Sequence, residues 1–359
     1  MDKIKRFFEC LVPITACNLK CEYCYVIQEN RRTLKKAIFS YTPSEIRYAL
    51  RKERVGGICY FSICGAGETL LQKEVVAIVK ELLSEGHYVN ITTNGTLTQR
   101  FQELVDILSP DEMARFHVSF SFHYLELKKR NLLNTFFENV RQIRNSGGSI
   151  LVQFNLYDGY IDSLDEIKNI CLKEIGAYPQ VALTRREDTG NVTDGTVRIH
   201  TSLTDEDYMR LGSSFNSPLF DFTNKNFKVK RSEFCYAGEW SSCLDLSTGM
   251  LTPCYACGKA INIFHNPNQK IKWNAVGHDC KLDYCVNSSH FLSLGTIPAL
   301  DTPTYAELRN RKDANWYNEQ MLSFLSSKLC ESNQEYSKIK IEYLTLKSRL
   351  RKFYRKMKR

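Results

Sequence analysis

Three cysteines lie close together near the start of the chain. Cys17, Cys21 and Cys24 follow the spacing C-x3-C-x2-C within eight residues. Structural zinc sites and electron-transfer iron–sulfur centres normally take four protein ligands. Three thiolates leave one metal position open, and an open position is where metal chemistry takes place. The stretch therefore predicts a reactive metal centre, with a partial zinc site or three unconnected thiols as the alternative.

The composition narrows the class of protein. The chain has 359 residues, 43% hydrophobic and 25% charged, which is typical of a globular protein. It contains no run of about 20 apolar residues that would predict a membrane span, and its first residues do not resemble a secretory signal. We therefore expect a cytoplasmic protein whose 14 cysteines stay reduced, so that clustered thiols indicate metal binding rather than disulfides.

Alternating strands and helices are expected to position these cysteines. Apolar runs predict strands at 7–14, 58–63, 88–92, 116–122, 149–156 and 180–184, and helical periodicity predicts helices at 42–50, 72–84, 99–108, 132–144 and 162–174. This alternation predicts an α/β fold with a parallel sheet covered by helices. Either a barrel or a doubly wound sheet satisfies the pattern, and in both the ligand residues lie at the carboxyl ends of the strands.

Other polar or glycine-rich segments follow the later strands. Gly65, Gly67 and Glu68 come after the second strand, and Thr93 and Asn94 come after the third. The fourth strand alternates polar and apolar residues, and the fifth offers two amides; their polar positions are His117, Ser119, Ser121, His123, Gln153 and Asn155. Each segment alone also fits an ordinary turn or a half-buried strand.

Taken in this order, these segments resemble radical S-adenosylmethionine (AdoMet) enzymes. In that family the three cysteines hold a [4Fe–4S] cluster, AdoMet chelates the fourth iron, and an electron cleaves AdoMet to a 5′-deoxyadenosyl radical. The resemblance implies a partial (β/α)6 TIM-like barrel over residues 1–185 and an electron donor of the flavodoxin or ferredoxin type. It departs from the family at Ala66, which replaces a glycine of the GGE motif. The implied AdoMet contacts are Tyr23, Gly65, Gly67, Glu68, Thr93, Asn94, Ser119, Ser121 and Asn155.

A second group of cysteines lies in residues 234–300. The segment 244–254 predicts a hairpin with its turn at 247–249, which would bring Cys235 and Cys254 together. The pattern resembles the SPASM and twitch extensions of radical AdoMet enzymes. That resemblance implies a Cys-rich, twitch-like domain whose auxiliary [4Fe–4S] cluster is held by Cys235, Cys254, Cys280 and Cys285. The alternative is a zinc site that uses Cys257 in place of Cys235.

The remaining regions are a connecting segment at 186–233 and C-terminal helices at 301–359. The charged residues 185–188 either contact substrate or form a solvated cluster. Residues 338–359 hold ten Lys or Arg and one Glu, whereas the rest of the chain is neutral. Apolar residues at 343, 346, 350, 353 and 357 predict an amphipathic helix. It could bind an anionic membrane surface or an acidic partner, or dock on its own domain; nucleic acid is disfavoured because no stacking platform accompanies it.

These patterns favour a radical AdoMet oxidoreductase. An auxiliary cluster would accept an electron from a substrate radical, which favours a two-electron oxidation such as alcohol to carbonyl. Relatives with a twitch extension include dehydrogenases of sugar-like alcohols and sulfatase-maturing enzymes that act on a peptide. Only sixteen residues precede Cys17, so a peptide-recognition domain is not expected there, and a carbohydrate-like small molecule is preferred over a peptide. A different class is a zinc-binding adaptor that docks through the basic segment.

Overall fold

The computed structural model describes residues 2–357 except 187–197, 256, 281 and 283, with side chains up to residue 350. Its centre is a run of six parallel strands, each paired with the next along the chain. These strands are β1 (Arg6–Val12), β2 (Cys59–Gly65), β3 (Tyr88–Thr93), β4 (Phe116–Ser121), β5 (Ser149–Leu156) and β6 (Gln180–Leu183). Right-handed crossovers taken in strict order place the helices on one face. The order therefore gives a partial barrel rather than a doubly wound sheet, whose strand order reverses.

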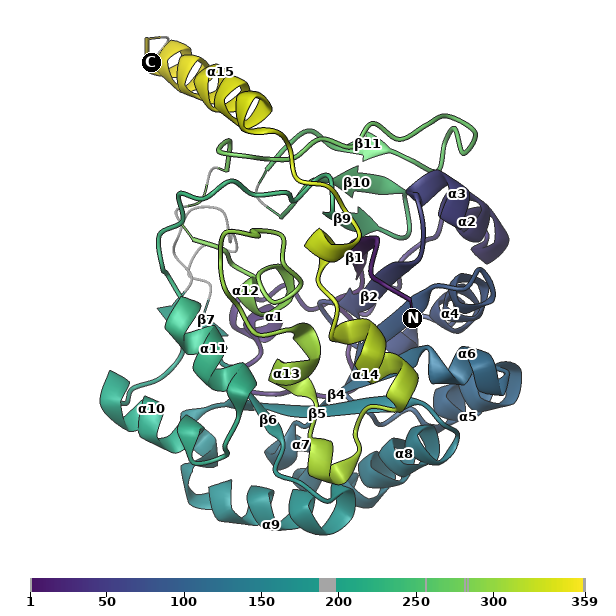
Figure 1. The fold of residues 1–359 in the computed structure, drawn as a ribbon. Helices are drawn as coiled ribbons and strands as arrows, with labels where there is room; N and C mark the ends of the chain where they lie inside the picture. Colours follow the sequence, from purple (N-terminus) through teal and green to yellow (C-terminus); the bar gives the residue numbers. More distant parts are fainter. Residues whose placement is uncertain (1, 187–197, 256, 281, 283, 358–359) are drawn as a thin grey trace.

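The helices between these strands lie on the outer side of the curved sheet, except α1, which lies near the centre of the view beside α12 (Figure 1). They are α1 (Tyr25–Gln28), α2 (Pro43–Ala49), α3 (Lys52–Val55), α4 (Glu74–Ser84), α5 (Thr98–Ile107), α6 (Pro110–Ala114), α7 (Tyr124–Lys129), α8 (Leu133–Asn145) and α9 (Leu164–Ile175). Helix α2 begins with a capping box between Thr42 and Glu45, and α9 ends at Gly176 with φ 78°. The predicted α/β architecture is confirmed.

The interior of the barrel contains a buried polar ladder that crosses three strands. Asn90 on β3 donates from Nδ2 to Ser62 Oγ on β2 at 3.2 Å, and Ser119 on β4 donates to Asn90 Oδ1 at 2.8 Å. All three residues are buried. Because each hydroxyl and amide finds a partner inside the sheet, these polar side chains can be buried without a large desolvation cost.

The hairpin predicted from the second cysteine region adds strands to the same sheet. Strand β9 (Ser241–Asp245) pairs with β1 in parallel and with β10 (Met250–Thr252) in antiparallel, and β10 pairs with β11 (Ile261–Asn262). The turn is fixed by Asp245, whose Oδ1 accepts hydrogen bonds from the backbone N–H groups of Ser247 and Thr248. Strand β1 is therefore covered on both edges, and the sheet has nine strands in the described part of the chain.

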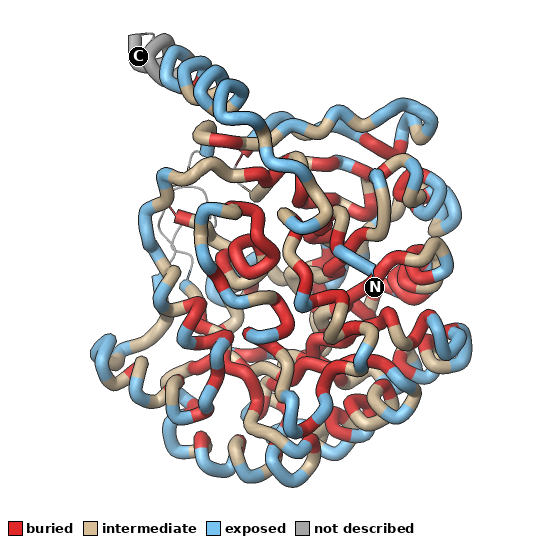
Figure 2. The backbone as a smooth tube through the Cα atoms, in the orientation of Figure 1, coloured by how far each residue is buried: buried red, intermediate tan, exposed pale blue. Residues whose placement is uncertain are grey.

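The rest of the chain closes one side of the barrel and then leaves it. Its elements are β7 (Arg185–Arg186), β8 (Arg198–Ile199), α10 (Asp205–Ser213), α11 (Pro218–Asn226), α12 (Ser288–Phe291), α13 (Tyr305–Arg309), α14 (Glu319–Leu325) and α15 (Lys338–Met357). Trp316 is fully buried, and its Nε1 donates to the carbonyl of Ile175 at 3.1 Å. Figure 2 shows buried backbone beneath α12–α14 and exposed backbone along α15. No described helix is both long enough and apolar enough to cross a membrane.

Candidate active site

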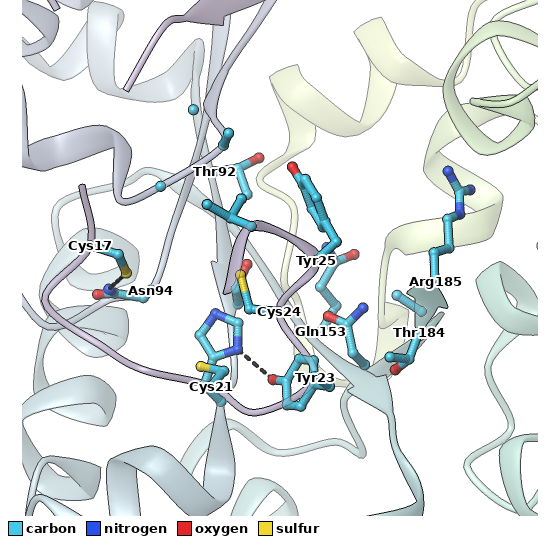
Figure 3. A pocket seen from close by; sticks show the side chains of 18 of the residues that line it. Cys17, Cys21, Tyr23, Cys24, Tyr25, Thr92, Asn94, Gln153, Thr184 and Arg185 are labelled. Carbon is cyan, nitrogen blue, oxygen red and sulfur yellow. Dashed lines mark hydrogen bonds between the residues drawn. The ribbon is translucent and has the colours of Figure 1, made fainter. Parts of the chain in front are cut away.

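A cavity of about 360 Å³, the first cavity, opens at the carboxyl ends of the parallel strands. Cys17, Cys21 and Cys24 line it from the loop after β1 (Figure 3). Eight of the nine predicted AdoMet contacts also line it, namely Tyr23, Gly65, Gly67, Glu68, Thr93, Asn94, Ser121 and Asn155. The topology thus gathers residues from five strand ends around one space.

Hydrogen bonds fix the position of the cysteine loop. Asn94 donates from Nδ2 to Asn18 Oδ1 at 2.8 Å and lies 3.8 Å from the sulfur of Cys17. Arg32, a residue that the sequence reasoning missed, donates to the carbonyl of Cys17 and also lines the cavity. The amide of Lys20 donates to Glu126 at 2.9 Å. The loop is therefore tied to the ends of β3 and β4 and to its own continuation.

The glycines after β2 allow two loops to touch. The amide of Gly67 donates to the carbonyl of Ile14 at 2.7 Å. A Cβ atom at Gly67 would lie 2.1 Å from the carbonyl oxygen of Ala16, and one at Gly65 would lie 2.6 Å from the side chain of Ile14. Any larger residue at either position would push the cysteine loop away, so both glycines serve close backbone packing as well as the cavity wall.

Glu68 braces the ends of β2 and β3 against each other. Its Oε1 accepts from Thr93 Oγ1 at 2.7 Å and from the amide of Leu70 at 2.9 Å, and its Oε2 accepts from the amide of Asn94 at 2.7 Å. Burial raises the pKa of Glu68, and these hydrogen bonds oppose that rise. Because its acceptors are occupied by the protein, Glu68 positions the segment 93–94 rather than presenting a free carboxylate to the cavity.

Tyr23 belongs to a small aromatic and imidazole group at the floor of the cavity. Its hydroxyl hydrogen-bonds His123 Nδ1 at 2.5 Å, and Tyr160 donates to the same hydroxyl at 3.1 Å (Figure 3). Burial lowers the pKa of His123 to about 4, so this imidazole is neutral at neutral pH. Tyr23 thus connects the cysteine loop to the end of β4.

Ser119 lies apart from the other predicted AdoMet contacts. Its hydroxyl is 4% exposed and donates into the Ser62–Asn90 ladder, and it does not line the first cavity. Ser119 lies on the same face of β4 as Ser121 but two residues further from the strand end. The alternation of polar residues identified the inward face correctly, although it could not indicate how deep each position lies.

Sequence reasoning missed a polar group on the opposite side of the cavity. His290 and Arg309 line it, contributed by α12 and α13. His290 Nδ1 lies 3.4 Å from Glu9 Oε2 on β1, and Arg309 Nη2 donates to the carbonyl of Ser289 at 2.8 Å. Arg309 is 2% exposed, and its Nη1 has no hydrogen-bond partner in the described part of the chain. Of the charged residues 185–188, Arg185 lines the cavity, while Glu187 and Asp188 lie outside the described residues.

Burial shifts the pKa values of Glu9 and His290 in opposite directions. The pKa of Glu9 is raised to about 7 by burial, with the Cys64 thiol, the Tyr255 hydroxyl and the Arg309 charge opposing the rise. Burial lowers the pKa of His290 well below its usual range, and the nearby positive charge of Arg309 lowers it further. A neutral imidazole that lines a cavity and has a carboxyl group behind it can accept a proton.

A second cavity of about 410 Å³ lies beside the β9–β10 hairpin. It is lined by the four cysteines expected to hold an auxiliary cluster, Cys235, Cys254, Cys280 and Cys285. Cys257, the competitor in the zinc alternative, forms a β-bridge with Cys254 but does not line this cavity. Helix α12 forms a wall between the two cavities, because Ser289 and His290 line the first whereas Asn287 and Phe291 line the second.

Both cysteine sets suit a group that bonds thiolates. Burial raises the pKa of Cys17, Cys21 and Cys285 above the usual range of a thiol and raises that of Cys235 to about 12. Several buried thiolates in one place are unfavourable unless a metal centre compensates their charge. Among the described residues no three Cys, His, Asp or Glu side chains converge on the position of a single metal ion. Each set is instead spread around a cavity.

Comparison with known proteins agrees with this geometry. Residues 11–173 match the model of the radical SAM superfamily. This match runs from β1 to α9 and covers a little less than half of the chain. The 7-carboxy-7-deazaguanine synthase of Aquifex aeolicus (strain VF5) is 32% identical over 112 residues, which cover 30% of this chain and 48% of that relative. The chain therefore matches about half the length of this curated relative.

Two solved structures resemble the fold of this chain. SuiB of Streptococcus suis bound to S-adenosylmethionine superposes with a TM-score of 0.51 at 16% identity, covering 73% of this chain and 64% of that one. Native anSMEcpe with bound AdoMet gives a TM-score of 0.51 at 15% identity, covering 88% and 98%. The family implies a [4Fe–4S] cluster and AdoMet, and the three cysteines at the mouth of the barrel fit that requirement.

Proposed function

We propose that this radical SAM protein cleaves AdoMet reductively and oxidises a small polar substrate by two electrons. The observation that carries the proposal is the arrangement of the two cysteine cavities on either side of one thin wall. An oxidation of this kind removes a hydrogen atom, a proton and an electron from the substrate. A carbohydrate-like alcohol that becomes a carbonyl compound is the preferred substrate class.

The chain supplies sites for both cofactor groups. Cys17, Cys21 and Cys24 would hold the first cluster, and Asn94 and Arg32 would keep the Cys17 region in place. When bound, this cluster and AdoMet would supply the 5′-deoxyadenosyl radical that abstracts the substrate hydrogen. The four cysteines of the second cavity would hold an auxiliary cluster, which would accept the electron. A flavodoxin or ferredoxin type of protein would deliver the electron for AdoMet cleavage.

We assign to His290 the role of the base that accepts the proton from the substrate. Its Nδ1 is buried beside Glu9, which leaves Nε2 for the cavity, and the side chain keeps 22% of its surface exposed there. The low pKa of this imidazole keeps it neutral at neutral pH and also makes it a weak base, so the Glu9 carboxylate would be needed to hold the proton on it. Glu9 would stabilise the imidazolium that forms, and Arg309 would orient an oxygen of the substrate.

The character of the cavity supports a small molecule more than a peptide. Its far side carries Arg185, His290 and Arg309, which suits a substrate rich in oxygen. A peptide- or protein-modifying maturase is the second candidate. A zinc-binding adaptor is the candidate of another class.

Anaerobic reconstitution with iron and sulfide tests the proposal. We expect a brown protein with about eight irons per chain and formation of 5′-deoxyadenosine from AdoMet and dithionite. Cys280→Ala is expected to lower iron to about four per chain while cleavage continues, because the two sites are separate. Cys330→Ala, which changes a thiol outside both cavities, is the matched control. A colourless zinc protein without cleavage would favour the adaptor, and unchanged iron in Cys280→Ala would remove the auxiliary cluster from the proposal.

A further inference from the structure

Helix α15 (Lys338–Met357) extends away from the body of the molecule (Figure 1). Its described contacts with the body lie on one side. Ser348 is 3% exposed and donates to the carbonyl of His278 at 3.3 Å, and Ile341 and Leu344 on the same side are half-buried. Next to this side, Lys340 Nζ lies 3.2 Å from the centroid of the Tyr336 ring, so the helix is attached along this side and its neighbouring edge.

The apolar stripe of α15 faces the other way. Ile339, Tyr343, Leu346 and Leu350 are 80%, 61%, 58% and 52% exposed. Their spacing of four, three and four residues places them along one side of a helix with about 3.6 residues per turn. One alternative predicted from the sequence was that this helix docks on its own domain. In the structure the helix contacts the domain through the side opposite to the apolar stripe. The side chains of Phe353 and Met357, which continue the spacing, lie outside the described residues.

Positive charge flanks the apolar stripe on both sides. By helical position, Lys340 and Lys347 lie along one edge, and Lys338 and Arg349 lie along the other together with the single carboxylate Glu342. In the part of the chain that the structure describes, these four cations form no ion pair with a carboxylate. An apolar stripe between rows of Lys and Arg matches a helix that lies in the surface of an anionic bilayer, with its cations at the headgroups.

We propose that α15 docks this protein on an anionic lipid surface. The apolar side chains would enter the boundary between headgroups and acyl chains, and the flanking cations would meet the lipid charges. A second copy of the chain is a poor occupant of the stripe, because pairing two helices that each carry a net charge of +9 over residues 338–359 would bring like charges together. An acidic protein would need a groove whose shape matches the helix. An anionic lipid surface accommodates both the apolar stripe and the flanking cations without such a groove.

Vesicle flotation of the full-length protein tests this proposal. We expect binding to vesicles of phosphatidylcholine with added phosphatidylglycerol, and about tenfold weaker binding to phosphatidylcholine alone or at high salt. Leu346→Asp should weaken binding to the anionic vesicles by about tenfold, because it places a charge in the apolar stripe. Leu172→Asp is the matched control, since Leu172 on α9 is 50% exposed, similar to Leu346, but lies far from α15 in the chain.

A charge reversal provides a second arm. Lys347→Glu should weaken binding to anionic vesicles, whereas Lys173→Glu on α9 should not. Circular dichroism and iron content are measured for every variant, so that loss of fold is separated from loss of docking. Equal binding by Leu346→Asp and the unchanged protein would overturn the proposal. Absence of vesicle binding together with a dimer, or with a complex with an acidic protein, that Leu346→Asp breaks would also overturn it, in favour of a protein partner.

Discussion

The two cysteine cavities are built in different ways. The first takes its cysteines from one short loop at the end of β1, and side chains from neighbouring strand ends hold that loop in place. The second takes its four cysteines from three separate segments that a hairpin on the outer edge of the sheet brings together. In the first cavity the rigid sheet positions the ligands. In the second the ligands depend on the path of loops, and Cys280 is even exposed.

Because of this difference, we expect single substitutions to affect the two sites differently. Losing one residue in the first cavity disturbs a group of mutually braced side chains. Losing one in the second affects a segment whose other anchors remain. The four changes below follow this contrast, beginning with the one expected to have the largest effect.

Cys17→Ser is expected to lower AdoMet cleavage by more than about a thousandfold, because a cluster with two remaining thiolate ligands would not be held at the mouth of the barrel. The auxiliary site should keep its iron, since its four cysteines lie in a separate cavity. Iron content and 5′-deoxyadenosine formation measure both effects. Loss of all iron would show that the two sites do not load independently.

Glu68→Gln is expected to destabilise the fold by about 1–3 kcal/mol and to weaken AdoMet binding. An amide nitrogen in place of one carboxylate oxygen would face a donor, either the amide of Asn94 or the hydroxyl of Thr93. Urea unfolding and AdoMet titration of the reconstituted protein give the two quantities. Glu53→Gln changes an exposed carboxylate on α3 and serves as the control. Equal stability of the two variants would contradict the bracing role.

Glu9→Gln tests the buried carboxyl group that lies behind His290 of α12. The measured quantity is the pH dependence of the free energy of unfolding. Burial raises the folded-state pKa of Glu9 from its ordinary value of 4.5 to about 7, so the folded protein binds this proton more tightly than the unfolded chain. The stability of the natural protein relative to Glu9→Gln should therefore be greatest below about pH 4.5 and fall as the pH rises through about 7. The total change is on the order of 3 kcal/mol. Urea unfolding at several pH values measures it, and parallel curves would show that Glu9 does not titrate in this range.

Asp245→Ala should have the smallest effect, a loss of about 1 kcal/mol. It removes the acceptor that fixes the turn between β9 and β10, and Cys254 follows that hairpin directly. We expect iron in the second cavity to be retained less well on dilution, while AdoMet cleavage stays unchanged. The measurements are iron content over time and 5′-deoxyadenosine formation. A loss of cleavage here would mean that the hairpin supports the first cavity through β1.

Much of the first cavity could be predicted because its residues are local to strand ends. A parallel sheet brings consecutive strand ends to one edge, so polar residues after each apolar run meet there. The alternation of polar residues could not indicate that Ser119 lies deeper in the barrel than Ser121. His290 and Arg309 were missed as cavity residues because they come from helices more than one hundred residues after β6, and no local pattern links those helices to β1.

The sequence by itself determined the six β/α units and the cysteine loop at their edge, because short-range periodicity and turn residues specify both. It also indicated the β9–β10 hairpin and the amphipathic character of α15. Only the tertiary structure decided that the hairpin joins β1, that four distant cysteines surround one cavity, and that the apolar stripe of α15 faces away from the body. These features depend on contacts between residues far apart in the chain, and their energies are summed over whole surfaces that no local pattern records.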